Sequence, residues 1–154
     1  MTSIDARLKE LGIDLPQPAK PVANYVPWVR TGNLVFTAGQ VPLKDGKIEY
    51  QGKIGREFTV EDGAAAARQC AINILAQVKD ACGGNLEKVK RCVKVVGFVN
   101  GVPEFADHPK VINGASDLLV SVLGDRGKHA RSAVGSGSLP VNVAVEVEAI
   151  FEVE

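Results

Sequence analysis

Arg131 is the side chain of this sequence that is best suited to hold a small anion. It stands in the segment His129-Ala130-Arg131-Ser132-Ala133-Val134, which is followed by Leu139-Pro140 and an alternating apolar and acidic stretch. A guanidinium presents a rigid fork of N–H donors that matches a carboxylate, and each charge-assisted hydrogen bond contributes roughly 1.5–3 kcal/mol. Arg131 is therefore a candidate carboxylate anchor, with a surface ion pair as the alternative interpretation.

The sequence lacks the signatures of several common catalytic sites. It contains no GxSxG elbow, P-loop, HExxH motif or dinucleotide fingerprint. The run Gly135-Ser136-Gly137-Ser138 has no helix after it, which favours a bent strand with close backbone approach over a phosphate-binding loop. Three cysteines without CxxC spacing are expected to be buried thiols, and with two histidines they do not predict a metal cluster. We expect no metal, no cofactor, and a loop position for His129.

The composition is that of one globular domain spanning residues 1–154. Apolar residues make up 45% of the chain, and 18 basic residues balance 18 acidic ones, so no net charge attracts a nucleic-acid backbone. The N-terminus carries charges where a signal peptide needs an apolar run, and no segment is apolar for long enough to span a bilayer. We expect a cytoplasmic protein without a membrane partner, and nucleic-acid binding is disfavoured.

Turn and cap residues divide the chain into helices and strands. Residues 1–20 are expected to form an N-terminal arm with a short helix from Ile4 to Leu11. Two β-rich runs around Gly32-Asn33 predict a hairpin over residues 25–38. The later elements are a tight turn at 44–47, a helix from the capping box Thr59-Val60-Glu61-Asp62 to Gly83-Gly84, a strand over 91–99, a helix from Pro109 to Gly124 with Asp107 as its cap, a strand near Arg131 and a long strand over 141–153.

These elements predict an α+β fold with one mixed sheet and both long helices on a single face. The strand over residues 91–99 is apolar on both sides, with Cys92, Val96 and Phe98 opposite Val93, Val95 and Val99. An apolar sheet face that no helix covers commonly marks an oligomer interface. We therefore expect self-association.

Several motifs together resemble the RidA/YjgF family of reactive intermediate deaminases. They are the strand start Arg131-Ser132-Ala133-Val134, the Leu139-Pro140 turn, the closing strand Val145-Glu146-Val147-Glu148-Ala149, and the segments Thr37-Ala38-Gly39-Gln40-Val41-Pro42 and Val111-Ile112-Asn113. Each motif alone is weak. As a group they are specific, and they extend over most of one domain.

The resemblance implies a chorismate-mutase-like fold and a homotrimer with clefts between subunits. The implied activity is hydrolysis of small 2-imino acids to 2-oxo acids and ammonia without a cofactor. Arg131 would bind the substrate carboxylate, and Glu146 would polarise water for attack on the C=N carbon and return a proton to the nitrogen. Tyr25 of an adjacent subunit would close the pocket, and Asn113, Gly39 and Ala133 are secondary substrate-binding candidates.

Departures from the family pattern keep other functions open. Ala133 stands where deaminating members usually carry cysteine, and Gly135 and Gly137 replace bulkier residues. A solvated glutamate is the competing interpretation of Glu146, and an interface aromatic is that of Tyr25. The alternative function is a non-catalytic member that binds a small carboxylate in the same cleft. A third hypothesis, endoribonuclease or translation inhibitor, is disfavoured by the balanced charge.

Overall fold

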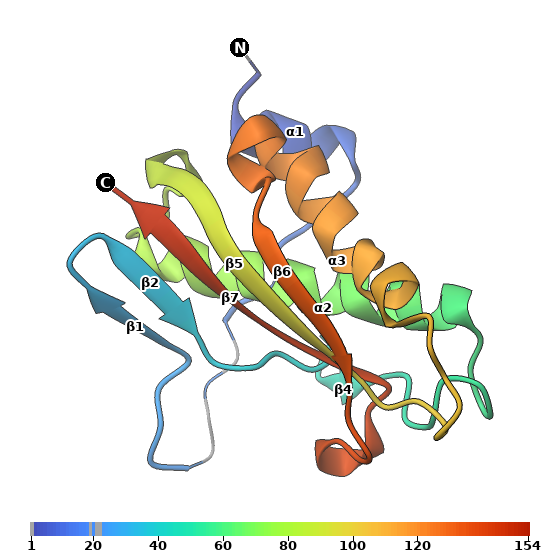
Figure 1. Ribbon diagram of the computed structural model, residues 1–154. Coiled ribbons are helices and arrows are strands. Elements are labelled where there is room, and N and C mark those ends of the chain that lie inside the picture. The colour runs from blue at the N-terminus through green and yellow to red at the C-terminus, as the bar shows by residue number, and fades with distance from the viewer. Residues whose placement is uncertain (1, 19, 21–22) are drawn as a thin grey trace.

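The computed structural model describes residues 2–18, 20 and 23–154. In this part of the chain, a five-stranded sheet has the order β1-β2-β7-β5-β6, and helices pack against it (Figure 1). The strands of the sheet are β1 (Trp28–Thr31), β2 (Leu34–Thr37), β5 (Val89–Val99), β6 (Ala130–Gly135) and β7 (Val145–Val153), and β3 (Leu43–Lys44) and β4 (Lys47–Ile48) form a separate hairpin. The helices are α1 (Ile4–Glu10), α2 (Val60–Ala81) and α3 (His108–Leu123), with short 3-10 segments η1 (Leu86–Lys88), η2 (Gly124–Gly127) and η3 (Pro140–Asn142).

The main sheet is mixed, as the sequence predicts. β5 and β6 run parallel, whereas the β1–β2, β2–β7 and β5–β7 pairs are antiparallel. A parallel pair needs a crossover connection, and α3 provides it between β5 and β6. Both long helices lie on one face of the sheet (Figure 1), so the predicted α+β architecture is confirmed.

The capping box and small residues predicted for α2 determine how this helix begins and packs. Oγ1 of Thr59 accepts from the backbone N–H of Asp62 at 3.1 Å, and Oδ2 of Asp62 accepts from that of Thr59 at 2.9 Å. The buried Ala66 and Ala67 follow in the next turn. A Cβ at Gly114 of α3 would overlap the carbonyl oxygen of Ala64, so α2 and α3 approach each other closely.

The N-terminal arm carries the predicted short helix. Ile4 and Leu8 of α1 are buried, and Nη1 of Arg7 donates to the carbonyl oxygen of Ser121 at the end of α3. Positions 1 and 19 of the arm lie outside the described residues. No described helix combines the length and the hydropathy needed to cross a membrane.

The final strand begins later than its alternating pattern predicts. β7 starts at Val145, whereas Val141 lies in η3 with φ of 49° and a side chain that is 57% exposed. Asn142 also has a positive φ, of 59°, and two left-handed residues interrupt an extended strand. From Val145 onward, alternate residues are buried beneath the helices, and the intervening ones, including Glu146, face the other side.

β5 departs from simple alternation at a β-bulge. Its register with β7 shifts between Cys92 and Lys94, so Cys92 is buried on the same side as Val95. Val93 is 37% exposed. The prediction that Cys92 shares a face with Val96 and Phe98 is therefore wrong, because an extra residue reverses the side-chain alternation.

The start of α3 also differs in detail from the prediction. Asp107 occupies the cap position, but its side chain makes no capping hydrogen bond. Its carboxylate instead lies 3.8 Å from Nζ of Lys110. Pro109 is the second helical residue rather than the first, since the helix begins at His108.

The sheet face opposite the helices carries both apolar and acidic side chains. Phe36 is 38% exposed there, and Val96, Phe98 and Ile150 are partly buried. Glu146 lies among them on β7. No described helix covers this face, and self-association through it stays a prediction (Figure 1).

Candidate functional site

Arg131 lies on the edge strand β6 and points toward α3. Its neighbour across the parallel ladder is Val95, which is buried on the helix-covered face. Nη1 of Arg131 donates to Oδ1 of Asn113 at 2.8 Å and to Oγ of Ser116 at 3.2 Å. Asn113 and Ser116 are three residues apart on α3, so both face the same strand. The structure thus brings the predicted residues Arg131 and Asn113 together.

These two acceptors leave one edge of the Arg131 guanidinium without a hydrogen-bond partner among the described residues. Nη1 carries two N–H bonds, and Asn113 and Ser116 provide one acceptor for each. Nε and Nη2 make no hydrogen bond to any residue that the structure describes. They form the side of the fork whose parallel N–H bonds match the two oxygens of a carboxylate. Arg131 can therefore bind a carboxylate without releasing α3.

Glu146 lies on the opposite face of the sheet and rests against Gly39. A Cβ at Gly39 would lie 3.0 Å from Cδ and Oε1 of Glu146, so only a glycine fits here without displacing the carboxylate. Partial burial raises the pKa of Glu146, and the neighbouring Glu148 carboxylate raises it further. A carboxylate with a raised pKa is better suited to exchange protons near neutral pH.

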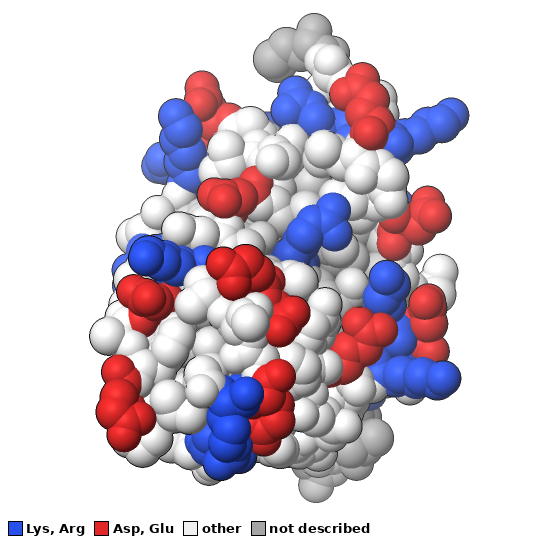
Figure 2. All heavy atoms as spheres, turned by 90° about the vertical axis from the view of Figure 1, so that its right-hand side faces the viewer, with Lys and Arg blue, Asp and Glu red and all other residues white. Residues whose placement is uncertain are grey.

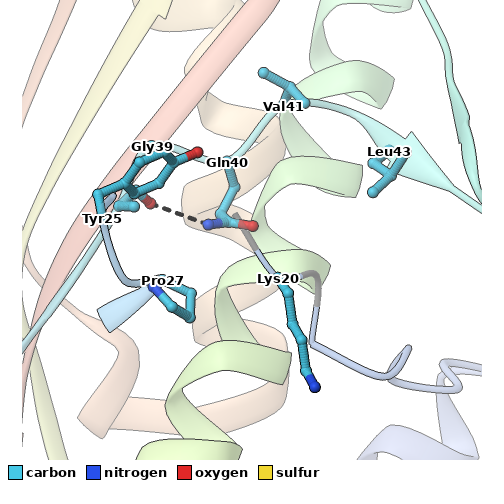
Figure 3. A pocket seen from close by; sticks show the side chains of 8 residues that line it. Lys20, Tyr25, Pro27, Gly39, Gln40, Val41 and Leu43 are labelled. Carbon is cyan, nitrogen blue, oxygen red and sulfur yellow. Dashed lines mark hydrogen bonds between the residues drawn. The ribbon is translucent and has the colours of Figure 1, made fainter. Parts of the chain in front are cut away.

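A small cavity adjoins Gly39 (Figure 3). It has a volume of about 120 Å³, and Tyr25 and Pro27 line it together with the segment from Ala38 to Val41. Backbone hydrogen bonds of 2.8 and 3.0 Å between Gln40 and Val147 hold this segment against β7. Tyr25 precedes β1 and is 56% exposed, so the prediction that it begins the first strand is wrong.

The predicted site residues form two separate groups within one chain. The anchor group, Arg131 and Asn113, lies between β6 and α3 on the helix-covered face. The carboxylate group, Gly39 and Glu146 with Tyr25 nearby, lies beside β2 and β7. Side chains on opposite faces of a sheet cannot meet. A single chain therefore does not bring Arg131 and Glu146 together.

The segment after Arg131 approaches its neighbours closely, as its small residues predict. Ala133 packs against the core beside Gly97, its partner on β5. A Cβ at Gly135 would lie 2.7 Å from Nε2 of His108, and Nζ of Lys53 donates to the carbonyl oxygen of Gly137 at 2.9 Å. Gly135 thus leaves room for His108.

The cysteines are free and buried, as expected of structural thiols. Burial raises the pKa of Cys92 to about 12, which keeps this thiol protonated at neutral pH. Among the described residues, no three His, Cys, Asp or Glu side chains gather in a way that could hold a metal ion.

Sequence reasoning missed two residues that extend the anchor group. Nε2 of His129 lies 2.9 Å from Oγ of Ser116, and Nδ1 of His129 lies 2.6 Å from the carbonyl oxygen of Gly127. His129 lies in the loop before β6, as the sequence predicts, and both of its ring nitrogens have hydrogen-bond partners. The spacing of Asn113 and Ser116 on one helical face was the available signal for Ser116, whereas only the packing of β6 on α3 reveals His129.

Comparison with known proteins extends over most of the chain. The family model described as "YjgF/chorismate mutase-like, putative endoribonuclease" matches residues 5–153. The chain is 45% identical over 150 residues to Protein TCP17 of Trypanosoma cruzi, covering 97% of this chain and 93% of the relative. It is 32% identical over 136 residues to the 2-iminobutanoate/2-iminopropanoate deaminase of Escherichia coli, covering 84% and 87% of the two chains.

A solved structure extends the match to three dimensions. The crystal structure of the protein Atu1372, with unknown function, from Agrobacterium tumefaciens superposes with a TM-score of 0.93 at 51% identity. The superposition covers 98% of this chain and 92% of that one. Family model, relatives and architecture agree, and the chain belongs to the RidA/YjgF family.

Proposed function

We propose that this protein hydrolyses small 2-imino acids to 2-oxo acids and ammonia without a cofactor. The observation that carries the proposal is the open side of the Arg131 guanidinium, which can take a carboxylate while α3 holds the other side. A relative that is 32% identical carries the name of such a deaminase.

The proposal requires a second subunit because the two groups of site residues lie apart in one chain. A homotrimer in which the anchor group of one subunit faces the carboxylate group of the next would assemble the site. The uncovered sheet face, with partly exposed Phe36 and Val134, supplies apolar surface for such an interface. The exposed Tyr25 would then gain a neighbour at the rim of the cleft.

The proposed reaction divides its tasks between these groups. Arg131 binds the substrate carboxylate and thereby positions the adjacent C=N carbon. Glu146 takes a proton from water as the water oxygen bonds to that carbon, and the proton then passes to nitrogen. The hydroxyl of this carbinolamine then gives its proton to the nitrogen as the C–N bond breaks, so that ammonia leaves and a C=O bond remains. The raised pKa of Glu146 makes its carboxylate a stronger base for taking the proton from water. Ala133 would contribute through its backbone.

The test is release of ammonia and 2-oxo acid from imines that an amino-acid oxidase generates in the same vessel. We expect the purified protein to accelerate release over buffer, and we expect Arg131→Ala to remove the acceleration. No acceleration for any of several aliphatic or aromatic imines contradicts the proposal.

A carboxylate-binding member without turnover is the second candidate. It is favoured by Ala133, which stands where deaminating members of the family usually carry cysteine. Gly135 and Gly137 also replace bulkier residues, so the segment after Arg131 carries smaller side chains than in those members. Saturable thermal stabilisation by 2-oxobutanoate, benzoate or serine, without ammonia release from any imine, would support this function over hydrolysis.

Ribonuclease activity receives less support from the charge distribution. On the face shown in Figure 2, acidic and basic side chains are interspersed, and no basic groove crosses it. RNA affinity generally depends on such a groove and falls steeply with salt. RNA cleavage that co-purifies with the protein and persists in Arg131→Ala would restore this third hypothesis.

A further inference from the structure

A chain of hydrogen bonds runs from a backbone carbonyl to the Arg131 guanidinium. The carbonyl oxygen of Gly127 is 2.6 Å from Nδ1 of His129, and Nε2 of His129 is 2.9 Å from Oγ of Ser116. The same Oγ accepts from Nη1 of Arg131 at 3.2 Å. His129 and Ser116 are both partly buried. The chain links η2, β6 and α3 behind the open side of the guanidinium.

The chemistry of these groups determines the direction of each hydrogen bond. A carbonyl oxygen can only accept, so Nδ1 of His129 must carry the proton. In the neutral ring Nε2 is then the acceptor, and the Ser116 hydroxyl donates to it. This donation turns an oxygen lone pair toward Arg131, whose Nη1 can only donate. His129 therefore selects the orientation in which Ser116 serves Arg131.

We propose that Ser116 and His129 are positioning residues that hold the Arg131 guanidinium so that its Nε and Nη2 edge faces the substrate carboxylate. Asn113 and Ser116 hold both N–H bonds of Nη1, which restrains rotation of the guanidinium plane. Pre-organisation of a binding group reduces the entropy that is lost when the ligand binds. The inference rests on the proposed function, because it concerns the same carboxylate.

Matched pairs of substitutions at His129 and Ser116 test this chain of hydrogen bonds. Gln at position 129 retains an acceptor for the Ser116 hydroxyl, whereas the shorter Asn does not reach it. Thr at position 116 retains the hydroxyl, whereas Ala removes it. We expect His129→Asn and Ser116→Ala each to raise KM by about 3- to 10-fold, the value of one lost neutral hydrogen bond, with a smaller change in kcat. His129→Gln and Ser116→Thr should recover most of the loss.

Ser121→Ala is the control for the loss of a hydroxyl, since Ser121 is exposed near the C-terminal end of α3. This variant should keep the KM of the unmodified protein. Equal KM values for Ser116→Ala, His129→Asn and the unmodified protein overturn the proposal. So does a loss confined to kcat, because a positioning role for the anchor predicts weaker binding.

Two measurements keep this inference separate from the proposed function. Calorimetric titration with 2-oxobutanoate reports carboxylate affinity whether or not imines are turned over, and the variants should show the same 3- to 10-fold loss. Nitrogen-15 NMR of the full protein at neutral pH should show His129 protonated on Nδ1. A neutral ring protonated on Nε2 overturns the positioning role of His129 even if the protein proves to be a deaminase. If imines are not turned over but the titration and NMR results are as expected, only the proposed function is rejected.

Discussion

The anchor group and the carboxylate group of this protein differ in how completely one chain organises them. Arg131 has two acceptors on α3, and one of them is supported in turn by His129. Glu146 is held by strand geometry and by contact with Gly39, beside an exposed Tyr25. The comparison teaches that one chain holds the Arg131 side chain in place more completely than that of Glu146. Under the proposed function, carboxylate binding would be prepared within the subunit, and the reacting groups would depend on a partner subunit.

Removal of the anchor should have the largest effect. Arg131→Ala eliminates two charge-assisted hydrogen bonds to the substrate, which corresponds to about 3–6 kcal/mol or about 10²- to 10⁴-fold in kcat/KM. Ammonia-release kinetics and titration with 2-oxobutanoate should both show the loss. Arg131→Lys retains the charge but not the fork, and should recover only part of it. Unchanged binding in Arg131→Ala would remove the distinction between the two groups.

Glu146→Gln should separate chemistry from binding. We expect a loss of about 10²- to 10⁴-fold in kcat, because the amide cannot take a proton from water. Affinity for 2-oxobutanoate should stay near that of the unmodified protein, since Arg131 is intact. Glu152→Gln, at the outer end of the same strand, is the matched control for the loss of one negative charge. Parallel loss of binding and turnover would show that the two groups act as one unit.

A smaller loss is expected from Gly39→Ala. The added Cβ would lie 3.0 Å from Cδ and Oε1 of Glu146 and would push the carboxylate aside. Misplacement of a reacting group by about 1 Å can reduce turnover by up to 10²-fold. The control is Gly137→Ala, because a Cβ there meets no atom within 4 Å. Ammonia-release kinetics that are equal for both variants would contradict the contact.

The smallest effect concerns the pH dependence of stability. The pKa of Glu146 is raised in the folded protein, so its contribution to stability is present at low pH and is lost as pH rises through the folded-state pKa. Gln at this position resembles the protonated form. Urea unfolding at fixed protein concentration should find Glu146→Gln more stable than the unmodified protein at neutral pH, with the difference shrinking at acidic pH. A stability difference that grows on acidification would contradict a raised pKa for Glu146 in the folded protein.

The fold could be predicted wherever a local signal determines an element. Thr59 and Asp62 mark the start of α2 because their capping box depends on four adjacent residues. Val141 was misplaced in the last strand because apolar alternation does not reveal a left-handed turn. Cys92 was assigned to the wrong face because the bulge in β5 is a property of its pairing with β7.

The sequence names candidate residues for the site but does not predict how they are arranged. The motifs name Arg131 and Asn113, and the structure places these two side chains within hydrogen-bond distance. Glu146 belongs to another face, which follows from the strand register rather than from the motif. The link from Ser116 to His129 joins a helix to a loop residue, and only their packing in three dimensions brings them within hydrogen-bond distance.

The alternation of buried and partly buried side chains along β7 links the position of Glu146 to the packing of the hydrophobic core. Val145 and Val147 on either side of it are buried beneath the helices, so a slip of one residue would exchange a carboxylate with a valine inside the protein. The same apolar residues that stabilise the domain thus also determine the face of the sheet on which the Glu146 carboxylate lies.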